Sequence, residues 1–303
     1  MMRVAFIGLG DIGGLMAVQL ARDPFSLTVW NRTPSKARDF AARHSARVAT
    51  NARDAVRGAE VIVTCLPSSA EVEAVLHGEQ GMLEALERGS VLLDCTSGDP
   101  PTSRSIAAEL SRRGVGYIDA PVSGGTIAAK SGSLTIMWGG EEQDFARVRA
   151  VAEAFGKKIV HAGPVGAGGA LKAVNNALLA VHILSTGEGL AMLVKAGVDP
   201  GVALEVINAS SGRSNTSENL IPQRVLTRDF PRTFRLALLD KDIGIAESLA
   251  ADLGMETPVL SLAAKRMHEA RAALGEEVDH VEAVKMIEAE NGVEIRGSSK
   301  PAG

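Results

Sequence analysis

Cysteine and metal-ligand patterns are scarce in this sequence. The two cysteines, Cys65 and Cys95, each lie in an apolar, strand-like run. They predict reduced core residues of a cytoplasmic protein rather than a disulfide. No histidine and cysteine cluster has the spacing of metal ligands, so we expect no bound metal.

Basic clusters and uninterrupted apolar runs are lacking as well. The formal net charge is only −4, which argues against nucleic acid as the main partner. No apolar run reaches the roughly 20 residues of a membrane span. Residues 3–18 are apolar, but glycines and Asp11 interrupt them and no small-residue cleavage site follows. We therefore expect a first strand there, not a signal peptide, and a cytoplasmic protein away from membranes.

The length and the order of elements predict two domains. With 303 residues, 46% of them apolar, the chain can form two packed cores. Strand-like runs alternate with helical patterns up to residue 162, which favours a parallel sheet built from βαβ units. They are residues 3–8, 27–30, 61–65, 91–94, 116–119, 133–139 and 158–161.

Beyond residue 162 the strand signal fades. Helical patterns follow at about 170–196, 200–208, 236–253, 258–273 and 281–290. We predict an α/β domain over 1–162, an all-helical domain over 163–296 and a disordered tail over 297–303. The first of these helices is apolar on most faces, so we expect it to be buried between domains or against another subunit.

A glycine pattern follows the first predicted strand. Gly8-Leu9-Gly10-Asp11-Ile12-Gly13 places three glycines between that strand and a helix, as in a Rossmann-type dinucleotide site. The first glycine makes the turn, the second admits the pyrophosphate and the third packs helix on strand. A purely structural glycine-rich turn is the alternative.

The end of the second predicted strand bears on the choice of dinucleotide. An NAD site usually has an acidic residue here, but this chain has Asn31, Arg32 and Thr33. Arginine can pair with a 2′-phosphate, so the triplet favours NADP over NAD. Alternatively, Arg32 stacks on the adenine of NAD. Two further strand ends, with Leu66 and Pro67 and with Thr96 and Ser97, are placed to contact the nicotinamide ribose, although turn chemistry alone would look similar.

Two more segments carry chemistry. Ser123, Gly124 and Gly125 offer a hydroxyl and unhindered N–H groups that suit a carboxylate, or else form an ordinary tight turn. A glycine-rich stretch from residue 163 enters the long helix, on which Lys172 and Asn176 share a face. The helix N-terminus disfavours a charged lysine, as a proton-transfer group near neutral pH requires. A solvated lysine after a linker is the alternative.

Four motifs in this order resemble the β-hydroxyacid dehydrogenases, which include 3-hydroxyisobutyrate dehydrogenase and tartronate semialdehyde reductase. They are Gly8-x-Gly10-x-x-Gly13, Asp119-Ala-Pro-Val-Ser-Gly-Gly125, Gly166-x-Gly168-x-x-x-Lys172-x-x-Asn175-Asn176 and Lys241-Asp242. The resemblance covers nearly the whole chain. It implies a Rossmann-type domain followed by a helical domain like the C-terminal one of 6-phosphogluconate dehydrogenase, and a homodimer or homotetramer with the long helix at the interface.

The resemblance also implies roles for matching residues. Lys172 resembles the catalytic lysine, and Lys241 resembles the lysine that closes over cofactor and substrate. The expected substrate-binding residues are Ser123, Gly124, Gly125 and Asn176. The expected cofactor-binding residues are Gly8, Leu9, Gly10, Asp11, Ile12, Gly13, Asn31, Arg32, Thr33, Leu66, Pro67, Thr96, Ser97 and Lys241.

The chain departs from the family pattern at two positions. Thr96 and Ser97 reverse the usual order, and Glu71 falls where some members have a cofactor-binding asparagine.

The expected reaction is hydride transfer between NADP or NAD and a small 3-hydroxy acid or its semialdehyde, with Lys172 as general acid and base. Three alternatives remain. An imine or semialdehyde reductase is one, although imine reductases on this scaffold generally lack the lysine. A dehydrogenase acting on a phosphorylated substrate and a non-catalytic NADP-binding module are the others.

Overall fold

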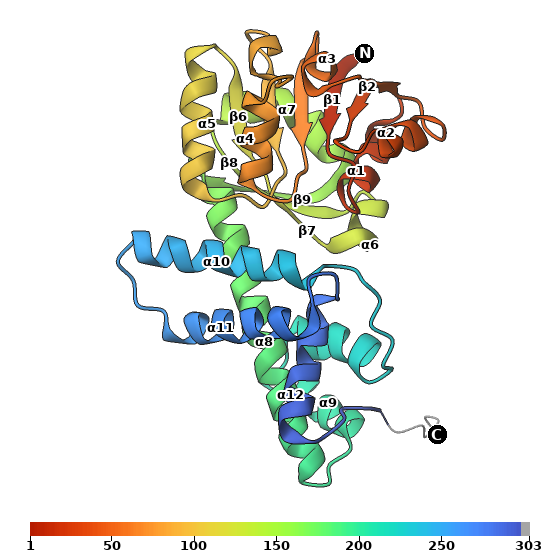
Figure 1. The fold of residues 1–303 in the computed structure, drawn as a ribbon, viewed down its shortest axis with the longest axis vertical. Coiled ribbons are helices and arrows are strands. Elements are labelled where there is room, and N and C mark those ends of the chain that lie inside the picture. Colours follow the sequence, from red (N-terminus) through yellow and green to blue (C-terminus); the bar gives the residue numbers. More distant parts are fainter. Residues whose placement is uncertain (298–303) are drawn as a thin grey trace. The chain divides into compact units, whose positions relative to one another are not determined.

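The computed structural model describes residues 1–297 and separates into two compact units (Figure 1). The first unit is Met1–Lys172, and the second begins at Ala173. The division falls inside one continuous helix, α8 (Ala167–Lys195), whereas the predicted domain boundary at residue 163 lies just before that helix. Of the predicted tail, Gly297 donates its N–H to the Leu226 carbonyl at 3.1 Å, and residues 298–303 lie outside the described residues.

The first unit contains a mixed sheet, with nine strands among the described residues. The strand order is β3-β2-β1-β4-β5-β6-β8-β7, and β9 pairs with β8. Pairing is parallel from β3 through β6, while β8 runs antiparallel to β6. The strands are β1 (Met2–Ile7), β2 (Phe25–Trp30), β3 (Arg47–Val48), β4 (Val61–Thr64), β5 (Val91–Asp94), β6 (Gly116–Asp119), β7 (Val122–Ser123), β8 (Leu134–Gly139) and β9 (Gly156–Gly163).

Helices cover both faces of this sheet. Alternate residues of a strand face opposite sides, so Val4 and Phe6 join one core while Ala5 and Ile7 join the other. The first core packs against α1, α2 and α7, and the second against α3, α4 and α5. The helices are α1 (Gly13–Leu20), α2 (Pro34–Ala41), α3 (Ala52–Val56), α4 (Ser69–His77), α5 (Pro100–Arg112), α6 (Gly125–Lys130) and α7 (Glu142–Phe155), with a 3₁₀ turn η1 (Leu83–Ala85).

The strand order identifies where a ligand can bind. It reverses between β1 and β4, which are neighbours at the centre of the sheet. In an open parallel sheet this switch point leaves a crevice outside the carboxyl ends of the strands. The loops after β1, β2, β4 and β5 all emerge at that edge, and they carry the predicted cofactor residues of the first unit.

The second unit is helical, as predicted. Its helices surround one apolar core, and α10 packs along α11 (Figure 1). Gly197, at a φ of 82°, follows the end of α8, and the Asp199 carboxylate caps α9. The remaining elements are α9 (Pro200–Asn208), the π-helix η2 (Thr216–Val225), α10 (Leu236–Asp252), α11 (Pro258–Leu274), the 3₁₀ turn η3 (His280–Ala283) and α12 (Val284–Asn291). The predicted fold class is therefore confirmed.

Helix α8 has both buried and exposed apolar residues. Ala177, Ala180 and Ile183 belong to the core of the second unit. Leu178 and Met192, in contrast, are 47% and 68% exposed. Among the described residues α8 alone is long and apolar enough to cross a membrane. A core helix passes the same test, so this criterion is weak support for a membrane span.

Candidate functional site

The glycine loop between β1 and α1 has the three features that a dinucleotide site needs. Gly8 has a φ of 104°, and a Cβ there would lie 2.3 Å from the Cys65 carbonyl oxygen. A Cβ at Gly13 would lie 2.2 Å from the Gly8 carbonyl oxygen. A Cβ at Gly10 would meet nothing within 4 Å, so its backbone faces open space. The turn, the close packing and the open middle glycine fit a bound pyrophosphate.

Asn31 holds this loop in place from the end of β2. Its Oδ1 accepts the Leu9 N–H at 2.9 Å, and its Nδ2 donates to the Thr33 carbonyl at 3.1 Å. The Asn31 oxygen is thus engaged by the protein itself. Arg32 beside it is exposed and forms no ion pair with any residue from 1 to 297. A guanidinium therefore stands where an NAD site usually has a carboxylate.

The loops after β4 and β5 are joined by side chains. The Thr96 Oγ1 accepts the Leu66 N–H at 3.1 Å, so these two predicted cofactor residues contact each other. Behind them the buried Asp94 carboxylate accepts hydrogen bonds from the Thr64 hydroxyl at 2.7 Å and the Thr96 N–H at 3.0 Å. Burial raises the pKa of Asp94, while these two donors act to lower it. Asp94 thus supports the edge of the sheet that carries the predicted cofactor residues, which we call the cofactor edge. Asp94 itself was not predicted as a site residue.

Glu71, one of the two departures from the family pattern, lies in the first turn of α4. Ser68 donates its hydroxyl to the Glu71 carboxylate at 2.5 Å. Ser69 of the same turn accepts the Asp99 N–H at 2.9 Å, which joins α4 to the loop that contains the half-buried Ser97. Glu71 is therefore engaged within its own helix turn. Pro67, just before this turn, is exposed.

The Ser123 segment forms a turn that only glycines adopt readily. Ser123 ends β7 opposite Thr135 of β8. Gly124 and Gly125 follow with φ values of 127° and 65°. A Cβ at Gly124 would lie 2.5 Å from the Ala128 Cβ, whereas one at Gly125 would meet nothing within 4 Å. The backbone at Gly125 is therefore open on the side where a side chain would stand, as a carboxylate-binding turn requires.

The start of α8 is bonded to the end of β6. The Asp119 carboxylate accepts the Gly166 N–H at 2.7 Å and the Gly169 N–H at 2.8 Å. A Cβ at Gly168 would lie 2.4 Å from the Met137 carbonyl oxygen. The glycines before Lys172 therefore admit the protein's own strands, where the sequence had only indicated close approach by some group. Burial raises the pKa of Asp119 to about 6, although both N–H groups favour its charged form.

Lys172 follows this anchored turn. It lies three residues beyond Gly169 and is 9% exposed. Lysines are rarely buried to this degree. Asn176 is four residues further along α8 and is 2% exposed.

Within the second unit, Asn176 and Lys241 meet at Asp242. The Asn176 Nδ2 donates to Asp242 Oδ2 at 2.6 Å, and the Lys241 Nζ lies 2.7 Å from Asp242 Oδ1. The Asn176 Oδ1 accepts from the Asn175 Nδ2 at 3.1 Å. These bonds fix the orientation of the Asn176 amide. Asp242 stood in a quoted motif, but it was not among the predicted site residues.

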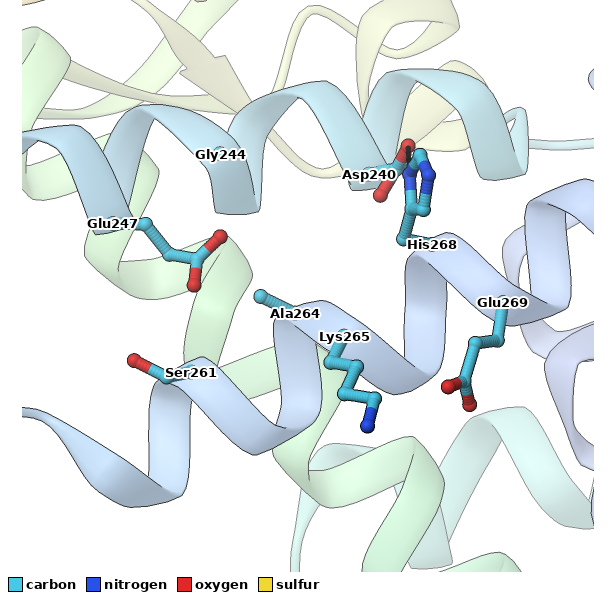
Figure 2. Close-up of a pocket in the computed structure, with 8 residues that line it drawn as sticks. All are labelled: Asp240, Gly244, Glu247, Ser261, Ala264, Lys265, His268 and Glu269. Carbon is cyan, nitrogen blue, oxygen red and sulfur yellow. Dashed lines mark ion pairs between the residues drawn. The ribbon is translucent and has the colours of Figure 1, made fainter.

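A pocket in the second unit lies away from these residues. It encloses about 550 Å³ between α10 and α11 and is open to solvent (Figure 2). In Figure 2 the His268 ring points toward Asp240, with Nδ1 3.5 Å from its carboxylate. The pocket is lined by Asp240, Gly244, Glu247, Ser261, Ala264, Lys265, His268 and Glu269. None of these is a predicted site residue.

Two known families match successive parts of the chain. Residues 3–163 match the NAD binding domain of 6-phosphogluconate dehydrogenase. Residues 166–287 match a family described as NAD-binding of NADP-dependent 3-hydroxyisobutyrate dehydrogenase. Together they cover both units, and the first alone covers more than half of the chain.

Individual relatives are similar along most of their length. NAD-dependent L-serine dehydrogenase of Pseudomonas aeruginosa is 38% identical over 269 residues, which is 87% of this chain and 90% of the relative. 2-(Hydroxymethyl)glutarate dehydrogenase of Eubacterium barkeri is 34% identical over 296 residues, covering 97% and 98% of the two chains.

A solved structure agrees with this. Mycobacterium tuberculosis 3-hydroxyisobutyrate dehydrogenase with L-serine superposes with a TM-score of 0.87 at 29% identity, covering 95% of this chain and 99% of that one. With both family regions and relatives of this similarity spanning nearly its whole length, the chain belongs to the β-hydroxyacid dehydrogenase family of NAD(P)-dependent oxidoreductases.

Proposed function

We propose that this protein oxidises the primary alcohol of a 3-hydroxy acid to its semialdehyde, with NADP as the preferred acceptor and Lys172 as the general base. The observation that carries this proposal is the buried Lys172, one turn beyond a helix start that Asp119 and three glycines hold against the sheet. A buried lysine on a fixed helix turn has the properties of a proton-transfer group.

The names of the relatives define a common substrate chemistry. L-Serine, 2-(hydroxymethyl)glutarate and 3-hydroxyisobutyrate each carry a carboxylate, a primary alcohol on carbon 3 and a substituent on carbon 2. They differ only in that substituent, which is an ammonium, a carboxyethyl or a methyl group. We infer a substrate of the same class, a 3-hydroxypropanoate with a group on carbon 2.

The proposed roles follow from what each residue offers. The Ser123 hydroxyl and the backbone of Gly124 and Gly125 bind the substrate carboxylate. Asn176, whose amide Asp242 orients, donates to the oxygen that is oxidised. When bound, the nicotinamide accepts the hydride from carbon 3. Lys172 takes the hydroxyl proton as that hydride leaves, and in reduction its ammonium returns the proton to the aldehyde oxygen.

The proposed preference for NADP depends on Arg32. The end of β2 carries no carboxylate that would repel a 2′-phosphate, and the exposed Arg32 guanidinium can pair with one. Lys241, from the second unit, is the further proposed cofactor contact.

A substrate panel tests the proposed reaction. It contains L-serine, 3-hydroxyisobutyrate, 2-(hydroxymethyl)glutarate and, for each, an isomeric 2-hydroxy acid whose alcohol is secondary. Each compound is tested with NAD and with NADP, and the reaction is followed by nicotinamide absorbance. We expect kcat/KM at least tenfold higher for the best 3-hydroxy acid than for its 2-hydroxy isomer, and higher with NADP than with NAD. Turnover of the 2-hydroxy acids alone would refute the substrate class, and a clear NAD preference would refute the role of Arg32.

We further propose that the protein is a cytoplasmic homo-oligomer. The exposed apolar residues Leu171, Leu178 and Met192 of α8 support a second copy as the partner, because large apolar side chains in a row mark interaction surfaces. The free cysteines, the partly buried Cys65 and the buried Cys95, fit a reducing compartment. Light scattering should give a mass of two or four chains, and a monomer would refute the oligomer.

A further inference from the structure

We propose that Asp119 is a positioning residue for Lys172: its carboxylate replaces the missing side-chain caps of α8, and its charge offsets the helix dipole at the lysine. The inference rests on the proposed role of Lys172 as the proton-transfer group. Asp119 uses both carboxylate oxygens to accept backbone N–H groups of the helix turn. It acts through the helix turn that carries the lysine.

Asp119 binds the two N–H groups that a capping box would satisfy at the start of α8. α8 begins at Ala167, so Gly166 is the residue before the helix and Gly169 is its third residue. In a capping box, the side chains of these two positions each bind the N–H of the other. Both are glycine here, so neither can do so. Asp119 binds both N–H groups with its two oxygens, from a strand 47 and 50 residues away.

Neighbouring glycines make room for this carboxylate. A Cβ at Gly139 of β8 would lie 2.7 Å from Asp119 Oδ1, and a Cβ at Gly168 would lie 2.9 Å from Asp119 Oδ2. A Cβ at Gly169 would lie 2.9 Å from the Gly98 carbonyl oxygen. The helix turn, two strands and the loop after β5 are therefore packed around Asp119 without spare space. A shift of the carboxylate would move the turn.

The same contacts place a negative charge at the helix turn that precedes the lysine. Lys172 is three residues beyond Gly169, which is about 4.5 Å along the helix axis. The N-terminus of a helix is its positive end and disfavours an ammonium, an effect that weakens beyond the first turn, here residues 167–170. Because Asp119 is 2% exposed, water screens its charge little. Asp119 therefore favours the protonated lysine and counteracts the helix dipole.

Among the described residues, charged and titratable groups from four elements lie near Asp119 or near the segment 163–166 that leads into its helix turn. Asp94 at the end of β5 and Tyr117 on β6 interact electrostatically with it. From α5, the Arg104 Nη1 approaches the Gly166 backbone, and on β9 the His161 Nε2 lies 2.9 Å from the Gly163 carbonyl oxygen. The pKa of Asp119 is about 6, so its carboxylate is charged at the neutral to alkaline pH where a lysine base works.

Asp119→Asn tests the proposal, because the amide keeps the size of the side chain, removes its charge and leaves one oxygen to accept an N–H group. The readouts are the pH profile of kcat/KM with the fastest panel alcohol and the pH dependence of Lys172 acetylation by acetic anhydride, quantified by mass spectrometry. Without the nearby negative charge Lys172 loses its proton more readily. We expect both curves to move to lower pH by about one unit, kcat to fall at least tenfold and the Kd of NADP to stay within about threefold.

Asp199→Asn is the matched control. Asp199 also accepts two backbone N–H groups, those of Gly201 and Val202, at the start of α9. The same chemical change there should leave the pH profile of the enzyme and the acetylation curve of Lys172 where they are. If Asp119→Asn does the same while losing only thermal stability, Asp119 is merely structural and the proposal is overturned.

Two further variants keep the result decisive. Asp119→Glu retains the charge but extends the side chain. The pH at which kcat/KM rises as Lys172 loses its proton should therefore stay unchanged, while kcat falls several-fold. Wild-type kcat in this variant would overturn the positioning role. Lys172→Ala shows whether Lys172 is the group that titrates in the pH profile of kcat/KM. If Lys172→Ala stays active with the same pH profile of kcat/KM, the proposed function fails, and this inference fails with it. If Lys172→Ala is inactive and Asp119→Asn leaves the pH profile of kcat/KM unchanged, only the inference fails.

Discussion

Single polar side chains at the strand ends hold the loops that form the cofactor edge. Asn31 binds the N–H of Leu9, and Thr96 binds the N–H of Leu66. Each bond joins two loops that are separate in sequence. The side chains thus shape the binding surface from behind, and the backbone faces left open, such as that of Gly10, remain for a ligand.

Arg32→Ala tests the choice of cofactor at the residue scale. A charge-assisted bond to a 2′-phosphate contributes about 1.5–3 kcal/mol, so we expect the Kd of NADP to rise at least tenfold while that of NAD changes less than threefold. Fluorescence titration of both nucleotides measures this. Arg22→Ala, an exposed arginine just after α1 at the opposite edge of the sheet, should change neither value. An equal loss for both nucleotides would show that Arg32 stacks on adenine.

Asp119 also makes stability depend on pH. Its pKa in the folded chain is about 6, against an ordinary value of 3.8, so the folded chain holds this proton more tightly than the unfolded chain. The stabilisation from the bound proton is complete below the ordinary value and is lost as the pH rises through 6. Asp119→Asn cannot ionise. Between pH 4 and pH 7 the wild type should therefore lose about 2 kcal/mol relative to this variant.

Urea unfolding of both proteins at several pH values measures that difference. Other titrating groups are common to the two proteins and cancel in the comparison. A difference that stays constant between pH 4 and pH 7 would contradict the raised pKa of Asp119.

At the scale of elements, strand and helix lengths explain what the sequence could predict. The strand-like runs at 91–94 and 116–119 coincide with β5 and β6, because buried strands are short and mostly apolar and each of these runs ends in a single buried aspartate. The two-residue strands β3 and β7 and the six-residue α6 are too short to leave a periodic signal. The helix predicted at 281–290 is divided into η3 and α12.

One element of the second unit depends on a contact that no local pattern shows. The buried Asp279 carboxylate accepts from Arg224 of η2 at 3.0 Å and from the Thr233 and Phe234 N–H groups at 2.8 and 3.1 Å. It thereby ties η2 to the segment that leads into α10. Pairs separated by more than 40 residues leave no trace in sequence spacing.

Asp279→Ala should therefore destabilise the second unit strongly. It leaves the buried Arg224 guanidinium without its partner, which typically costs about 3–5 kcal/mol. Glu277→Ala is the control, because Glu277 pairs with Arg232 and Arg235 at the surface and should contribute less than about 1 kcal/mol. Guanidinium unfolding followed by circular dichroism compares them. Equal losses in the two variants would contradict the account of η2.

For the whole molecule, motif order predicted more than any single motif did. Four motifs along the chain indicated the family, and the two family regions and the relatives confirm it. The roles of Asp94 and Asp119 could not be predicted. Each is one of 36 acidic residues, and what distinguishes Asp119 is the distant N–H groups that it binds only in the folded chain.

In the proposed mechanism, Lys172 transfers the proton during oxidation of a 3-hydroxy acid. The most direct measurement is the turnover of Lys172→Ala with saturating NADP and the fastest panel alcohol, together with the Kd of NADP. We expect kcat to fall by a factor of about 100 or more, the usual effect of losing a general base, and the Kd to stay within about twofold. Near-normal turnover in Lys172→Ala would contradict the account.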